Sequence, residues 1–167
     1  MSDTSSTGAT YVLFRLGSEV YGLPVSAVTG VVRFKAPTLV PRASESVLGV
    51  INLRGRVLPV VDVGRRFSGT RFEETATSRI VVIEDEHGTA GIAVDQASEV
   101  VTFQADAVRP VPESVLSAQT ARVFAGMVER PGGLVVLLDP TALMPQPEDH
   151  AFAVGTPDAR KEDGDDV

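Results

Sequence analysis

The chain has 167 residues, of which 43% are hydrophobic, and its formal net charge at pH 7 is −7. This size suits one medium domain or two small barrels that share a core. The absence of cysteine excludes disulfides, thiolate metal ligands and cysteine nucleophiles, and it fits a reducing compartment. Most of the acidic excess falls in residues 146–167, so the remaining body is nearly neutral, which argues against nucleic-acid binding.

The termini and the hydropathy of the chain predict a cytoplasmic protein. The polar start MSDTSSTGAT lacks the basic and apolar regions of a secretory signal. No apolar run in the sequence reaches the roughly 18–20 residues that cross a bilayer. Residues 1–9 are predicted to be disordered, and residues 146–167 are predicted to form a disordered acidic tail. The ordered part is therefore expected at residues 10–145.

The first ordered segment predicts a hairpin followed by a helix. Residues 11–16 alternate along the chain as a half-buried strand does, and residues 20–23 return after a turn at Gly17. Pro24 suits a first helical position, and the valines of residues 25–32 follow at helical spacing. We expect about two turns of helix here, with one apolar face.

The stretch Gly49–Val63 (GVINLRGRVLPVVDV) carries the clearest pattern of the first half. Two strands, residues 49–53 and 56–63, are joined tightly at Arg54-Gly55, where the glycine supplies the positive φ that such a turn needs. The polar and turn-rich residues 64–78 form the expected seam between the two halves of the domain.

The second half has a similar plan of hairpin, loop and hairpin. Further strands are expected at residues 80–83, 90–94, 100–103, 123–129 and 134–138. Asp139 and Pro140 supply an N-cap and a first residue for a short helix over residues 141–144. A total of about nine or ten short strands with little helix predicts an all-β barrel or sandwich. The two halves are too dissimilar in sequence to identify a repeat.

Two groups of polar residues raise the question of catalysis. His87 and the acids of residues 84–86 could be drawn as a metal cluster, but consecutive residues of a turn point in different directions, so we interpret them as a solvated turn. Asp62, Asp95 and Asp139 each end an apolar run, and two such carboxylates could form an acid–base pair. We interpret them as acceptors for backbone N–H groups. A small-ligand barrel or a hydrolase using Asp62 and Asp95 remains the alternative.

Four sequence blocks resemble one known family. They are YVLFRLGSEVYGLPVSAV, GVINLRGRVLPVVDV, GIAVDQASEVV, and VRPVPES followed by GMVERPGGLVVLLDP. From about Tyr11 to Met144, the chain resembles the CheW-like coupling-protein family of bacterial and archaeal chemosensory arrays. The resemblance implies an all-β fold of two intertwined five-stranded SH3-like β-barrels, packed side by side, with short helices. Barrel one is expected at residues 10–78 and barrel two at residues 79–145, and strand exchange between them is left open.

The resemblance also implies a function. Members of the family tether the histidine kinase CheA, through its regulatory domain, to the cytoplasmic tip of chemoreceptors, without catalysis and without a cofactor or metal. We therefore expect a cytoplasmic protein at receptor arrays on the inner face of the membrane, with no nucleic-acid partner and no membrane insertion. A module of another chemosensory pathway, serving surface motility or gene regulation, is the alternative.

The resemblance further implies which residues meet the partners. The positions that match surfaces at or near receptor or kinase are Asn52, Leu53, Arg54, Gly55, Gly49, Val28, Gly91 and Val100. For the valines, core packing is an equal alternative. The family commonly carries an acidic residue on its first helix that pairs with the hairpin arginine, and Gly30 stands at that position here. Arg54 is therefore expected to find another acid, within the chain or on a partner.

Overall fold

A computed structural model describes residues 8–68, 70–118 and 120–145 of the chain. Residues 1–7 and 146–167, both within segments predicted to be disordered, lie outside the described residues. The prediction of disorder is wrong for residues 8 and 9, which begin strand β1 (Gly8–Leu16). They are ordered because Gly8 and Ala9 pair with Gln104 and Phe103 of strand β8 (Gln96–Gln104).

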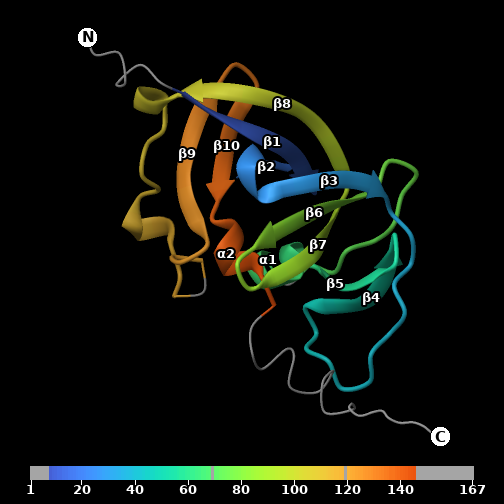
Figure 1. Cartoon of the computed structure of the whole chain (residues 1–167). Coiled ribbons are helices and arrows are strands. Elements are labelled where there is room, and N and C mark those ends of the chain that lie inside the picture. Colours follow the sequence, from blue (N-terminus) through green and yellow to red (C-terminus); the bar gives the residue numbers. More distant parts are fainter. Residues whose placement is uncertain (1–7, 69, 119, 146–167) are drawn as a thin grey trace, which may run out of the picture.

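The fold is mostly β with only short helices, as the sequence predicts (Figure 1). The other strands are β2 (Glu19–Pro24), β3 (Val28–Arg33), β4 (Val47–Leu53), β5 (Arg56–Val61), β6 (Arg79–Asp85), β7 (Gly88–Val94), β9 (Phe124–Arg130) and β10 (Gly133–Leu138). The helices are α1 (Val63–Ser68), α2 (Pro140–Leu143) and the 3₁₀ turns η2 (Val25–Ala27), η3 (Ala105–Ala107) and η4 (Glu113–Val115). Within the described ranges, no helix has the length and apolar character to cross a membrane.

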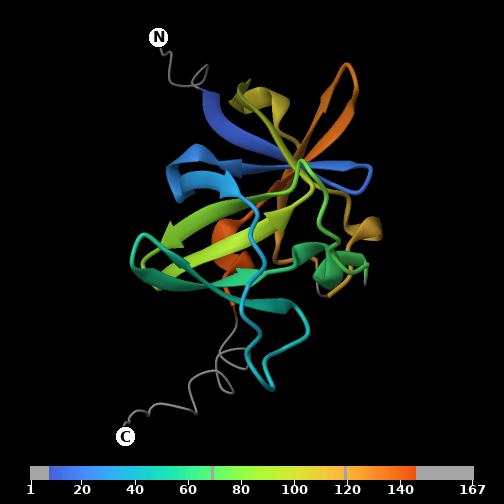
Figure 2. The same ribbon diagram turned by 90° about the vertical axis from the view of Figure 1, so that its right-hand side faces the viewer.

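The strands form two five-stranded sheets. One sheet has the order β8-β1-β2-β10-β9, and the other has the order β3-β6-β7-β5-β4. Most neighbours are antiparallel, but β2 pairs with β10 and β5 pairs with β7 in parallel. The first sheet lies above the second in Figure 1, and the view in Figure 2 shows the same two layers from the side. The architecture is therefore two small sheets packed against each other.

The two sheets do not divide the chain at residues 78 and 79, where the sequence placed the seam. β1 and β2 join β8, β9 and β10, whereas β6 and β7 join β3, β4 and β5. The chain thus exchanges one hairpin in each direction, which is the strand exchange that the sequence left open. Non-local backbone pairs enforce it, since Tyr21 pairs with Val136 and Val60 pairs with Gly91.

Each half of the chain supplies five strands and a short α-helix in the same order. The correspondence extends to single hydrogen bonds. Thr29 Oγ1 donates to the carbonyl oxygen of Val82 over 3.4 Å, and Ser98 Oγ donates to that of Leu13 over 3.3 Å, each beside a shift in strand register. The fold is therefore a structural repeat, although over their whole length the two halves are too dissimilar in sequence for the repeat to be identified there.

The predicted helix at residues 24–32 is wrong. Residues Val25–Ala27 form a single 3₁₀ turn, and β3 follows with alternating half-buried and exposed side chains. Val28 and Val32 are four positions apart, a spacing that fits one face of a helix and equally one face of a strand. Pairing of β3 with β6 decides between them, because β-branched side chains favour the pleated sheet. The predicted terminal helix is present as α2, capped by Asp139 Oδ1, which accepts from the backbone N–H of Thr141 at 3.0 Å.

The apolar core has three parts. One cluster, which includes Ile80, lies within the sheet of β3–β7, and another, which includes Leu137, lies within the other sheet. A central cluster joins both sheets and includes Phe14 from β1 and Ile92 from β7. Each sheet therefore packs around its own apolar side chains, and the central cluster holds the two sheets together as a support for the surface hairpins.

Candidate functional site: the β4–β5 hairpin

The predicted hairpin of Gly49–Val63 is present, with its turn at Arg54-Gly55. Leu53 pairs with Arg56 across this two-residue turn. Arg54 and Gly55 both have positive φ angles, 55° and 87°, as a type I′ turn requires. A left-handed conformation costs a non-glycine residue about 1–2 kcal/mol. The pairing of β4 with β5 on both sides of the turn therefore holds Arg54 in a backbone conformation that it does not favour.

Two hydrogen bonds fix this turn. Asn52 Oδ1 accepts from the backbone N–H of Gly55 at 3.0 Å, and Lys35 Nζ donates to the carbonyl oxygen of Asn52 at 2.8 Å. Leu53 is half-buried and packs against the apolar cluster of its own sheet. The predicted contact residues Asn52, Leu53 and Gly55 therefore have a structural part, which is to hold the turn that presents Arg54.

Arg54 is exposed, and its guanidinium forms no hydrogen bond or ion pair with any residue that the structure describes. Its neighbour Arg56 differs, because Nη2 of Arg56 donates to Thr89 Oγ1 at 2.7 Å. A planar guanidinium presents five donors in a fixed arrangement that matches a carboxylate. Arg54 is therefore the cation at this tip that is open to a partner.

A groove of about 230 Å³ lies beside the hairpin, and Gly30, Leu53, Arg54 and Glu84 are among the residues that line it. Gly30 lies on strand β3, paired with Val82, and not on a helix as expected. A Cβ placed at Gly30 would meet no atom within 4 Å, so the groove is open at this point. Glu84 shares the groove, but no ion pair joins it to Arg54 in the described part of the chain.

Gly49 and Gly91 are buried, and neither position leaves room for a side chain. Gly49 has a φ of 145°, and a Cβ there would collide with the carbonyl oxygen of Thr38. At Gly91, a Cβ would lie 2.6 Å from Cγ2 of Ile80. Their roles at partner-facing surfaces stay predictions, and the structure gives each of them a packing role.

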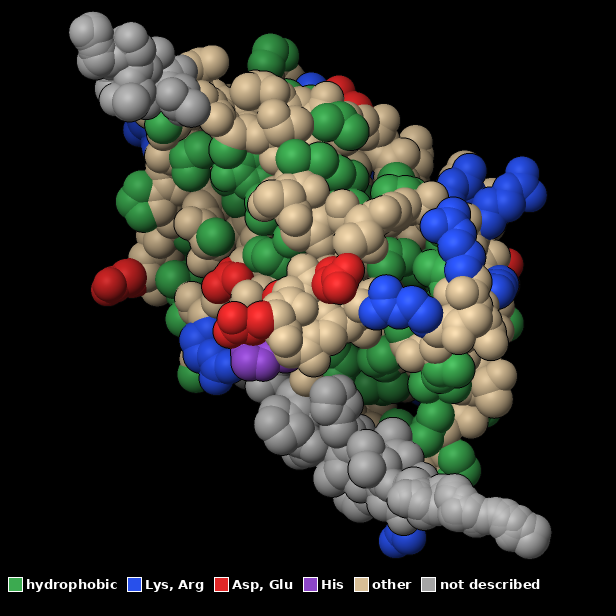
Figure 3. Space-filling view, in the orientation of Figure 1, with side chains coloured by type: hydrophobic (Ala, Val, Ile, Leu, Met, Phe, Trp, Pro, Cys, Tyr) green, Lys and Arg blue, Asp and Glu red, His purple; other side chains and the backbone are tan. Residues whose placement is uncertain are grey.

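The two predicted valines lie in different environments. Val28 is half-buried against the central core, whereas Val100 on the edge strand β8 is 63% exposed. The other sheet has β3 as an edge strand. Val25, in the turn just before β3, is 43% exposed, and Val31, on β3, is 41% exposed. The face in Figure 3 carries many apolar side chains, with Lys and Arg side chains gathered near its right-hand edge. Exposed valines therefore occur on an edge of each sheet.

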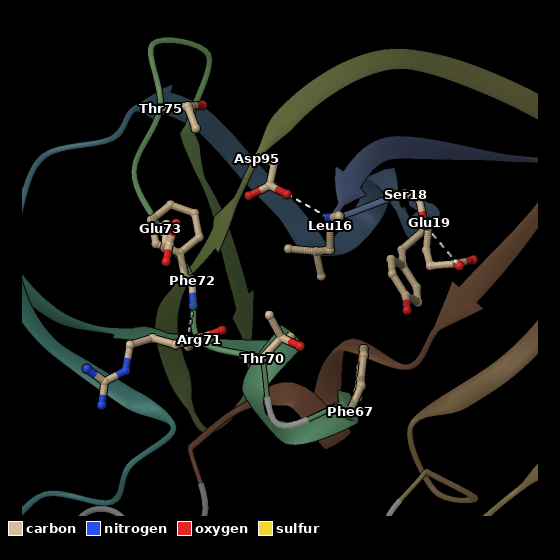
Figure 4. A pocket seen from close by; sticks show the side chains of 14 residues that line it. Leu16, Ser18, Glu19, Phe67, Thr70, Arg71, Phe72, Glu73, Thr75 and Asp95 are labelled. Carbon is tan, nitrogen blue, oxygen red and sulfur yellow. Dashed lines mark hydrogen bonds between the residues drawn. The ribbon is translucent and has the colours of Figure 1, made fainter.

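Asp62 and Asp95 both line a second cavity, but each carboxylate accepts backbone N–H groups. Oδ1 of Asp62 accepts from Arg65 at 3.1 Å and its Oδ2 accepts from Phe72 at 2.7 Å. Oδ2 of Asp95 accepts from Gly17 at 2.6 Å (Figure 4). These contacts match the structural interpretation of the strand-end aspartates. In the described ranges, no three His, Asp or Glu side chains are grouped so as to hold a metal ion.

Sequence reasoning missed a pair of exposed residues on corresponding hairpins. Val57 on β5 is 67% exposed, and Leu134 on β10 is 53% exposed. Each lies just after the turn of its hairpin, at the same position of the structural repeat. The signal that could have found them is the shared pattern of GVINLRGRVLPVVDV and GMVERPGGLVVLLDP, which aligns without gaps.

Comparison with known proteins agrees with this architecture. The family model described as CheW-like domain matches residues 10–148. The chemotaxis protein CheW of Bacillus subtilis is 29% identical over 144 residues, which cover 86% of this chain and 92% of that protein. The chemotaxis protein CheW of Rhizobium meliloti is 30% identical over 145 residues, with the same two coverages of 86% and 92%. The crystal structure of the scaffolding protein TtCheW from Thermoanaerobacter tengcongensis matches with a TM-score of 0.72 at 29% identity, covering 83% of this chain and 89% of that chain.

The exchanged sheets and the exposed hairpin define a mostly β interaction module. The chain belongs to the CheW-like domain family, as the four sequence blocks predict. It is a coupling protein of chemotaxis, with the role of a scaffold adaptor.

Proposed function

We propose that the chain couples the regulatory domain of a CheA-type histidine kinase to the cytoplasmic tip of chemoreceptors, without catalysing a reaction. The observation that carries this proposal is the CheW-like match across residues 10–148. On this proposal the protein is cytoplasmic and works at receptor arrays on the inner face of the membrane. The surfaces of the described residues support it in three ways.

The first support is the hairpin tip. Arg54 is exposed and unpaired among the described residues, and the turn that carries it is fixed by Asn52 and Lys35. A rigid support lowers the entropy that a side chain loses when it binds. We therefore assign Arg54 to contact with a carboxylate of a partner, and Asn52, Leu53 and Gly55 to positioning it.

The second support is the set of exposed valines. Val25 and Val31 at β3, and Val100 on β8, stand on the edge of one sheet or the other. A partner helix buries its apolar stripe in such a surface through side chains spaced three and four residues apart. We assign this surface to the helical hairpin at the receptor tip, with Val28 supporting it from the core side.

The third support is the pair Val57 and Leu134, which stand exposed on corresponding hairpins. The two hairpins that carry these residues offer similar apolar surfaces. Such surfaces suit a partner that contains the same structural repeat. We assign these residues to contacts with the kinase regulatory domain. A non-catalytic role fits the same molecule, since the carboxylates of Asp62 and Asp95 accept backbone N–H groups.

The test is binding of the purified protein to a kinase regulatory domain and to a receptor-tip fragment, measured separately by titration calorimetry. Arg54→Ala is expected to weaken at least one of the two affinities about tenfold, which corresponds to about 1.4 kcal/mol. Arg122→Ala is the matched control, because Arg122 is also exposed but lies outside the hairpin. Val100→Asp is expected to weaken receptor binding and to leave kinase binding unchanged. Absence of binding to both partners at 100 μM would refute the proposed function.

A further inference from the structure

A cavity of about 600 Å³ lies between the β1–β2 turn, helix α1 and the segment 70–75 (Figure 4). Its volume falls in the range of about 300–1,000 Å³ that small-molecule sites occupy. None of the eight predicted contact residues lines it. The coupling function described above therefore leaves this cavity unused.

Aromatic side chains form its walls and are held in place by further rings. The ring centroid of Tyr21 lies 5.6 Å from that of Phe67, and Phe67 in turn packs on Phe124 at 5.2 Å. On the other side, Phe72 packs on Phe34 at 4.9 Å. These contacts fix the walls before any ligand binds, so a ligand would meet a preformed apolar surface.

Carboxylates surround these walls. Glu19, Glu73 and Asp95 line the cavity, and no residue of the described ranges forms an ion pair with any of them. Arg71 also belongs to the lining, but its guanidinium points away from the cavity in Figure 4. The cavity therefore combines a negative rim with aromatic faces, and both attract a cation.

Tyr21 provides a further polar group. It is only 9% exposed, it lines the cavity, and its hydroxyl forms no hydrogen bond within the described part of the chain. The hydroxyl oxygen is not among the fully buried side-chain atoms that lack a partner, so it is open to the cavity that Tyr21 lines. A phenol oxygen accepts hydrogen bonds as well as donating one, so an N–H donor of a ligand could satisfy it.

We propose that this cavity is a binding site for a small organic cation with an apolar body, in which the Tyr21 hydroxyl accepts from an N–H donor and the Glu19 and Glu73 carboxylates, on opposite sides of the cavity (Figure 4), attract the positive charge. The apolar body packs against Phe67 and Phe72. A guanidinium or ammonium group attached to a ring or a short alkyl chain has this chemistry. The site does not depend on the kinase or the receptor.

The probe is benzylguanidinium, and its neutral isostere benzylurea is the comparison. Titration calorimetry with the full chain is expected to give a dissociation constant of about 1 mM for the cation and binding at least tenfold weaker for the urea. Glu19→Gln and Glu73→Gln each remove one negative charge, and each is expected to weaken the binding of benzylguanidinium about threefold to tenfold. Glu129→Gln, an exposed acid on β9 outside the cavity, is the matched control and should change nothing.

A spectroscopic measurement locates the bound cation. Burial and then the Glu19 carboxylate raise the pKa of Tyr21, and a bound cation favours the phenolate, so saturating benzylguanidinium should lower that pKa. The chain has two tyrosines, and Tyr11→Phe leaves Tyr21 as the single absorbing phenol. Equal binding of benzylguanidinium and benzylurea, no saturation by either at 20 mM, or a Tyr21 pKa that the cation does not move would each overturn the proposal.

Discussion

Glu99 on β8 and Arg130 on β9 form an ion pair of 3.1 Å between the two edge strands of one sheet. The contact brings opposite edges of that sheet together, so the sheet closes on itself. At the corresponding positions of the other sheet stand Gly30 and Leu53, which form no such pair and line the groove beside Arg54. The junction between the two edge strands is therefore closed by an ion pair in one sheet and is open in the other sheet.

An acid introduced at position 30, in the open junction, is expected to form an ion pair with Arg54 of the same chain. Gly30→Glu places a carboxylate in the groove that Arg54 lines, where a Cβ meets no atom within 4 Å. We expect partner binding through Arg54 to weaken severalfold. Stability should rise by about 0.5–1 kcal/mol, because glycine is unfavourable within a strand. Denaturant unfolding and the binding titration measure the two effects.

Gly30→Gln is the control for this substitution, because it changes the strand propensity in the same way without adding a charge. It should give the same gain in stability and leave partner binding unchanged. Equal weakening of binding by Gln and Glu would mean that bulk in the groove, and not the charge, matters there.

Asp62 and Asp139 occupy corresponding positions but are expected to differ in their contribution to stability. Asp62 is 1% exposed and accepts two backbone N–H groups, whereas Asp139 accepts that of Thr141. Hydrogen bonds to a charged group contribute about 1.5–3 kcal/mol each, so Asp62→Ala should lower the free energy of unfolding by about 3–5 kcal/mol. Asp139→Ala should cost about 1 kcal/mol, as loss of an N-cap does. Urea unfolding of both variants tests the difference, and equal losses would contradict it.

Alanine at the two hairpin glycines should have unequal effects. Gly49→Ala drives a Cβ into the Thr38 carbonyl oxygen, whereas a Cβ at Gly55 meets no atom within 4 Å. We expect a loss of about 2–4 kcal/mol at Gly49, from strain and overpacking, and about 1 kcal/mol at Gly55, from its positive φ alone. The comparison of unfolding midpoints is the measurement. A milder effect at Gly49 than at Gly55 would mean that the Thr38–Val50 bridge yields easily.

Stability should fall at alkaline pH because of Tyr21. Burial and the nearby Glu19 carboxylate raise the pKa of Tyr21 above its usual value of 10.0. The folded state therefore holds the phenol proton more tightly than the unfolded state does, and its contribution is complete below pH 10 and is lost as the pH rises through the folded pKa. Tyr21→Phe should flatten this part of the profile in urea unfolding between pH 9 and 11.5. An unchanged slope in the variant would assign the alkaline loss to other groups.

The parts of the fold that were predictable depend on local chemistry. Arg54-Gly55 marked a two-residue turn, and Asp139-Pro140 marked the start of a helix, because the preferences of turns and caps are set by a few neighbouring residues. The strand at residues 28–33 was missed because the spacing of its valines fits two periods. Only pairing with β6, which is distant in sequence, decides between them.

The candidate site was predictable in part for the same reason. The position of Arg54 at a turn follows from its neighbours, and the resemblance already placed Gly30 where an acid commonly stands. Whether another acid of the chain reaches Arg54 depends on the fold, which brings Glu84 of β6 to the same groove without an ion pair among the described residues. The aromatic cavity was not foreseen either. Tyr21 lies far from Phe67 and Phe72 in the sequence, and the β1–β2 hairpin reaches α1 only through the exchange of strands.

The exchange also sets an order of assembly during synthesis. All five strands of one sheet, β3 to β7, lie within a continuous stretch that ends at Val94, whereas the other sheet needs β1 and β2 from the start of the chain and β10, which ends at Leu138. Long-range pairings form late, because the intervening chain must first be brought together. As the chain emerges from the ribosome, the sheet of β3–β7 can therefore form first, and the β1–β2 hairpin can pair fully only after β8, β9 and β10 have been synthesised.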